Sequence, residues 1–177
     1  MIVAEAHPLL AEAVGLPCPQ WRLAGFEAEL GSRLPGVYRD FLAHHNGAVL
    51  RANVIAVSGW VFAHTDVYAL FGLERPLETC DLRWNREVLR DVTGDSLLAV
   101  ACDAGGSPFC LELAGAAAGC VVYVPLEQPS ARHVIADSFE AFLASIRLLP
   151  AVNEMRPPQT NRSIRNGVPG RLERCVA

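Results

Sequence analysis

The sequence contains no lysine, so all fifteen of its basic side chains are arginines. Nineteen acidic residues give the 177-residue chain a formal net charge of −4. The acidic excess lies in residues 1–150, with 17 acidic side chains against 10 arginines (net −7), whereas residues 151–177 carry five arginines and two glutamates (net +3). An acidic surface repels phosphates, so we expect no nucleic-acid binding and a preference for a basic partner.

Long apolar runs are also missing. Although 51% of the residues are hydrophobic, no uninterrupted run approaches the roughly 20 residues that a membrane-spanning helix needs. The first ten residues, MIVAEAHPLL, hold an acidic residue where a secretory signal would carry basic ones. These features predict a soluble, cytoplasmic protein with no membrane partner.

The cysteines do not have the sequence spacing of a metal site. No two of the six form a Cys-x-x-Cys pair, and none stands within four residues of a histidine. Cys102, Cys110 and Cys120 fall in apolar runs, where a free thiol behaves as a small buried hydrophobe. We therefore expect no metal and no cofactor.

The segment Leu34–Ala48 carries both a helix start and a helix stop. Pro35 suits the first helical position, and Asn46-Gly47 favours a left-handed exit. Between them, apolar residues spaced four apart share one face. A preceding helix is predicted over Trp21–Leu30, and the short connection between the two predicts a helical hairpin.

The rest of the chain alternates strand and helix patterns. Strands are predicted over residues 48–58 and 60–71, and a helix over 82–92 through Trp84, Val88 and Val92. Residues 97–102, 109–113 and 120–124 are three apolar strands joined by short turns, which indicates an antiparallel meander. Asp137 begins a last helix, with Glu140 in capping-box spacing.

Together these elements predict an α+β fold: an N-terminal helical hairpin, a mostly antiparallel twisted sheet with helices packed on it, and a C-terminal helix. The predicted domain covers residues 20–149. An N-terminal extension (1–19) precedes it, and an irregular basic tail (150–177) follows it.

The order of these parts resembles the SUKH superfamily, the domain of the Smi/Knr cell-wall regulators and of many bacterial immunity proteins. The matching pieces are FEAELG at 26–31, LPGVYRDFL at 34–42, Asn46-Gly47, FGL at 71–73, the strand and turn at 97–106, GCVVY at 119–123 and DSFEAFL at 137–143. The resemblance implies a non-enzymatic binding domain, and in bacteria a protein that neutralises a cognate toxin by covering it. A regulatory or scaffolding protein with a non-toxin partner is the alternative.

A basic toxin domain would be recognised by carboxylates beside aromatic side chains. The middle third of the chain supplies both kinds of residue on or near expected loops. The candidate partner-binding residues are Trp60, Asp66, Glu74, Glu78, Asp81, Trp84, Asp91, Asp95 and Asp103.

The sequence also allows one enzymatic alternative. Cys102 beside Asp103, with His64 or His133 as the base, has the residue types of a cysteine hydrolase. Such a nucleophile must be exposed and within hydrogen-bond reach of its base, whereas Cys102 ends an apolar run. We therefore expect no catalytic residues.

Overall fold

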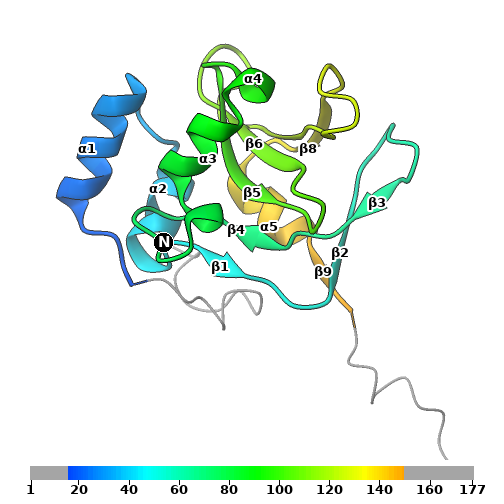
Figure 1. Cartoon of the computed structure of the whole chain (residues 1–177), viewed down its shortest axis with the longest axis horizontal. Coiled ribbons are helices and arrows are strands. Elements are labelled where there is room, and N and C mark those ends of the chain that lie inside the picture. Colours follow the sequence, from blue (N-terminus) through cyan, green and yellow to red (C-terminus); the bar gives the residue numbers. More distant parts are fainter. Residues whose placement is uncertain (1–15, 150–177) are drawn as a thin grey trace, which may run out of the picture.

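The computed structural model describes residues 16–149. The predicted tail, and all but the last four residues of the predicted N-terminal extension, lie outside the described residues. In chain order the elements are α1 (Gln20–Leu30), α2 (Gly36–His44), β1 (Ala48–Val49), β2 (Asn53–Ala56), β3 (His64–Thr65), β4 (Ala69–Leu70), the 3-10 helix η2 (Glu78–Cys80), α3 (Leu82–Val88), α4 (Arg90–Thr93), β5 (Leu97–Cys102), β6 (Pro108–Glu112), β7 (Val121–Tyr123), β8 (His133–Ala136), α5 (Phe139–Ser145) and β9 (Arg147–Leu148) (Figure 1).

The strands form two antiparallel sheets. Six strands pair in the order β1-β4-β5-β6-β7-β8, and three pair in the order β3-β2-β9. The predicted meander is confirmed as β5, β6 and β7, and β8, which the sequence did not predict, extends it. With helices before and after the strands, the predicted α+β fold is confirmed.

The N-terminal helical hairpin is also confirmed, because α1 and α2 are consecutive and in contact. The second helix is shorter than predicted. Pro35 has an extended backbone and precedes the first helical residue, so it is the N-cap residue. Past the end of α2 the predicted left-handed exit is present, with φ of 49° at Asn46 and 99° at Gly47.

The prediction of single strands over residues 48–58 and 60–71 is wrong. Each segment instead contributes one strand to each sheet: β1 pairs with β4, and β2 pairs with β3. Polar side chains explain the break. The buried Asn53 amide donates to the Arg51 and Val67 carbonyls, and its oxygen accepts from the Val67 N–H at 2.9 Å. A residue that bonds backbone in this way substitutes for regular strand pairing.

Asn46 has the same role beside the larger sheet. Its amide donates to the Leu73 carbonyl at 2.9 Å and accepts from the Leu73 N–H at 2.8 Å. Gly72 lies against this junction, and a Cβ atom there would stand 2.1 Å from the Asn46 carbonyl oxygen. Only glycine permits such a close approach of two backbones.

Two of the helix predictions need correction. The helix predicted over 82–92 is interrupted at Leu89, which divides α3 from α4. The last helix is capped by Ser138, whose hydroxyl accepts from the Ala141 N–H at 3.1 Å. Asp137 therefore lies outside the helix, and Glu140 is one position too early for the predicted capping box.

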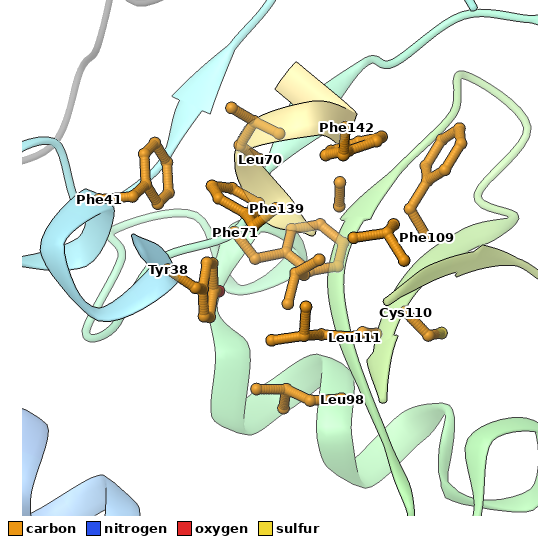
Figure 2. Close-up of a cluster of buried hydrophobic side chains, with 14 of the residues drawn as sticks. Tyr38, Phe41, Leu70, Phe71, Leu98, Phe109, Cys110, Leu111, Phe139 and Phe142 are labelled. Atoms are coloured by element: carbon orange, nitrogen blue, oxygen red, sulfur yellow. The ribbon is translucent and has the colours of Figure 1, made fainter. Parts of the chain in front are cut away.

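Aromatic side chains connect α2, α5 and the sheet. Phe139 lies edge-on to Tyr38 (4.7 Å between centroids), and Phe142 lies 5.3 Å from Phe109 of β6 (Figure 2). In Figure 1, α3 and α4 lie in front of β5 and α5 lies behind the sheet. Layers on both sides explain why β5 is buried along nearly its whole length.

Candidate interaction surface

The nine candidate residues do not form one surface. Six of them lie along the segment from Glu74 to Asp95, which runs through η2, α3 and α4. The other three, Trp60, Asp66 and Asp103, lie around the β2–β3 connection and the β5–β6 turn, on the opposite side of Figure 1 from α1. The structure therefore separates the candidates into two groups.

Asp103 is an internal residue, only 6% exposed. Its Oδ2 accepts from the Tyr123 hydroxyl at 2.7 Å and from the Thr65 hydroxyl at 3.1 Å, and its Oδ1 accepts from the Ser107 N–H at 2.8 Å. Burial, with the hydrogen bond to Asp103 and the negative charge of that carboxylate, raises the pKa of Tyr123. The carboxylate holds the β5–β6 turn against β3 and β7, so it is not available to a partner.

Trp60 and Asp66 hold the β2–β3 connection in place. The Trp60 ring is half-buried and lies edge-on to Tyr123 and Phe62, with centroids 5.1 and 5.0 Å away. Asp66 accepts from the Ala104 N–H at 3.1 Å. Beyond Trp60, Val61 is 84% exposed and Phe62 is 70% exposed. This exposed pair was not predicted, because residues 60–71 were expected to form a strand.

Two carboxylates of the other group act within the fold. Asp81 caps α3 by accepting from the Arg83 and Trp84 N–H groups, and it also accepts from the Arg75 N–H. Glu74 pairs with Arg22 of α1 at 2.7 Å. These contacts join the segment to α1 and order the start of α3.

The remaining four candidates of this group are exposed: Glu78, Trp84, Asp91 and Asp95. The helix predicted over 82–92 had its apolar spacing at Trp84, Val88 and Val92, and the first two of these side chains are 36% and 51% exposed. Leu82 and Asn85 take the inner positions instead. The Asn85 amide is buried because it donates to the Thr79 and Asp81 carbonyls. Because the inner face of α3 includes the polar Asn85, apolar spacing alone did not identify this face or show that Val88 points outward.

The residues of the cysteine-hydrolase alternative lack the electrostatics of a reactive thiol. Burial is the main cause that raises the pKa of Cys102 to about 12, and the nearby Cys80 and Asp103 contribute to the same shift. A catalytic thiol needs the opposite shift, because the thiolate is the nucleophile. Of the two candidate bases, His133 uses Nδ1 on the Ser58 carbonyl oxygen at 3.1 Å.

One depression of about 350 Å³ lies between α1 and the turn that follows it. Glu27 lines it, but its carboxylate accepts from the Leu34 N–H at 3.0 Å and pairs with Arg39. Within residues 16–149 no group of three or more His, Cys, Asp or Glu residues is arranged to hold a metal ion. None of the helices in this part of the chain is both long and apolar enough to cross a membrane.

Comparison with known proteins gives one family match. A family model described as SMI1 / KNR4 family (SUKH-1) matches residues 17–145, well over half of the chain. The matched range runs from just before α1 to the end of α5. No curated protein matches the sequence.

Proposed function

The chain belongs to the SMI1 / KNR4 family (SUKH-1), and on that premise we propose that it is a non-enzymatic protein that acts by binding another protein. SUKH domains are in general protein-interaction domains. The finer proposal is that this chain is a cytoplasmic bacterial immunity protein, which neutralises a basic toxin domain by covering its active surface.

One observation carries the proposal: Asp103 is buried and Cys102 is half-buried in the fold, while other acidic groups and an aromatic group are exposed at the surface. Asp103 and Tyr123 bond to each other, and the raised pKa of Cys102 keeps its thiol protonated near neutral pH. Trp84, Asp91 and Asp95 are exposed on α3, α4 and the turn that follows. Exposed aromatic and acidic side chains suit a basic protein surface.

The test is co-purification of the full chain from its native host, with identification of any protein recovered in one-to-one amounts. The proposal expects a basic protein that arrests growth when expressed alone and is harmless when co-expressed with this chain. Opposite charges steer association, so the association rate should fall steeply as salt rises. A stoichiometric partner that is harmless alone would instead identify a regulatory scaffold.

The enzymatic alternative needs its own measurement. Thiol alkylation by iodoacetamide at pH 7 should modify Cys102 no faster than it modifies a peptide thiol, because the raised pKa leaves little thiolate. Cys102→Ser should keep all partner binding. Rapid alkylation at Cys102, together with a hydrolytic activity lost in Cys102→Ser, would overturn the non-enzymatic proposal.

A further inference from the structure

The turn between α2 and β1 contains an asparagine followed by a glycine, a dipeptide that can lose its side-chain amide without an enzyme. Glycine has no Cβ atom, so its backbone nitrogen reaches the preceding side-chain carbonyl carbon without steric hindrance. Attack by this nitrogen closes a succinimide ring, and the amide nitrogen leaves as ammonia with the proton of the glycine N–H. Water then opens the ring to aspartate or to isoaspartate. Asn46-Gly47 therefore has the residue types of a deamidation site.

In the folded chain the Asn46 side chain is fixed on another segment. It is only 4% exposed, its amide nitrogen donates to the Leu73 carbonyl at 2.9 Å, and its oxygen accepts from the Leu73 N–H at 2.8 Å. Ring closure makes the side-chain carbonyl carbon tetrahedral and removes the nitrogen, so the amide must give up both bonds. The reaction therefore requires that the contact between Asn46 and Leu73 opens first.

The products of the reaction do not fit the place that Asn46 occupies. Aspartate would put a carboxylate oxygen where the donating nitrogen stood, against the Leu73 carbonyl oxygen, and neither of these oxygens carries a proton to share. Isoaspartate lengthens the backbone by a methylene group. Gly72 packs so closely on the Asn46 carbonyl group that a Cβ atom on Gly72 would overlap it, so a longer backbone has no room either. Once the reaction has occurred, the contact cannot form again.

The position of Asn46 favours local opening. It lies immediately before β1 and Gly47, and β1 is a two-residue strand at the edge of the larger sheet that pairs only with β4. Edge segments open at a lower free energy than the central strands of a sheet. We propose that Asn46 is a deamidation site whose reaction is controlled by opening of the Asn46 junction, meaning residues 46–47 with residues 72–73, and that the reaction makes this opening permanent.

The first test compares the full chain folded in buffer with the same chain unfolded in guanidinium chloride, both at mildly alkaline pH, by peptide mapping with mass spectrometry. In the unfolded chain Asn46 should react as fast as Asn166, which also precedes a glycine, and much faster than Asn53, which precedes a valine. In the folded chain Asn46 should react about tenfold more slowly or less, because only the open fraction reacts. Equal rates at Asn46 in the two states would overturn the proposal.

A pair of glycine variants tests whether the junction controls the reaction. Gly72→Ala should accelerate deamidation of Asn46 in buffer, because the new Cβ forces the two backbones apart, whereas Gly25→Ala should leave the rate unchanged. If Gly72→Ala does not fold, the original chain at guanidinium concentrations below its unfolding transition takes its place, and the Asn46 rate should rise with denaturant. A rate that does not respond would overturn control by opening.

The reaction product tests whether the change is permanent. In an Asn166→Gln background, deamidation at Asn46 adds one negative charge, so ion exchange separates the modified chain from the unmodified chain of the same sample. The modified chain should unfold at a lower guanidinium concentration, and Asn46→Asp should show the same direction of change. Identical unfolding curves for modified and unmodified chains would overturn the proposal. None of these measurements involves a partner, so their outcome is independent of the proposed binding function.

Discussion

Residues 97–124 and residues 46–72 both form antiparallel strands, yet different contacts hold them. In the first region β5, β6 and β7 each pair with their neighbour in sequence, and nearly all their side chains are buried and apolar. In the second region four two- to four-residue strands divide between two sheets. Asn46 and Asn53 bond to backbone there, in place of longer strand ladders.

The comparison shows two ways of specifying a strand. An apolar run with short turns needs only burial and its adjacent neighbour. The short strands depend instead on a few polar groups and on one glycine, so single substitutions should affect the second region far more than their size suggests.

The largest effect is expected at Gly72. In Gly72→Ala the new Cβ would stand 2.1 Å from the Asn46 carbonyl oxygen, so one of the two backbones must move. The free energy of unfolding should fall by about 3 kcal/mol or more, measured by urea denaturation. Gly25→Ala in α1 is the control, because nothing lies within 4 Å of its Cβ position. It should be neutral or stabilising. If both variants changed the free energy of unfolding by the same amount, the close backbone approach at Gly72 would not be what stabilises residues 46–72.

Asn53→Ala is expected to lower the free energy of unfolding by about 2 kcal/mol. The substitution leaves the Val67 N–H and the buried Val67 carbonyl without their hydrogen-bond partner. Urea denaturation measures the total, and hydrogen exchange at the Val67 amide measures the local effect. That amide should exchange much faster, while amides of β5 and β6 change only in line with the global stability. Uniform acceleration across both sheets would contradict a local role for Asn53.

The same contrast explains how far the sequence predicted the fold. The strands of residues 97–124 were found from their apolar runs, and the helices from their spacing. The divided strands could not be found, because whether Asn53 is a surface residue or a buried partner of Val67 depends on a contact between residues 14 apart in sequence. β8 and β9 were also not predicted, since they are only four and two residues long and their residues are half-buried or exposed.

The candidate surface was predicted only in part. Residue type identified Trp84, Asp91 and Asp95 as exposed candidates, but it could not show that Asp103 is internal. An aspartate that follows a strand looks the same in sequence whether it faces solvent or accepts from a tyrosine 20 residues later. Residue type also could not show that Val88 is exposed while the polar Asn85 faces inward.

Asp103→Asn tests the contact that joins the two regions, because Thr65 of β3 and Tyr123 of β7 both donate to its Oδ2. Loss of charge-assisted hydrogen bonds should lower the free energy of unfolding by about 1.5–2 kcal/mol. Asp66→Asn is the matched control. Its carboxylate is more exposed and accepts one backbone bond, so we expect a loss below about 1 kcal/mol in the same urea titration. If Asp66→Asn lost more stability than Asp103→Asn, the buried Asp103 carboxylate would not be the main contact between the two regions.

The smallest effect is expected at Tyr38, where packing rather than polar bonding should account for all the stability. Its ring is buried between α2 and α5, and its hydroxyl has no hydrogen-bond partner within residues 16–149. Burial also raises the pKa of this hydroxyl. Tyr38→Phe removes an unsatisfied polar group and keeps the ring, so thermal unfolding should show a change between zero and about 1 kcal/mol of added stability. Tyr123→Phe should be destabilising, because that hydroxyl donates to Asp103. If both variants lose the same stability, the Tyr38 hydroxyl has a partner in solution, and the α2–α5 contact also depends on a polar bond.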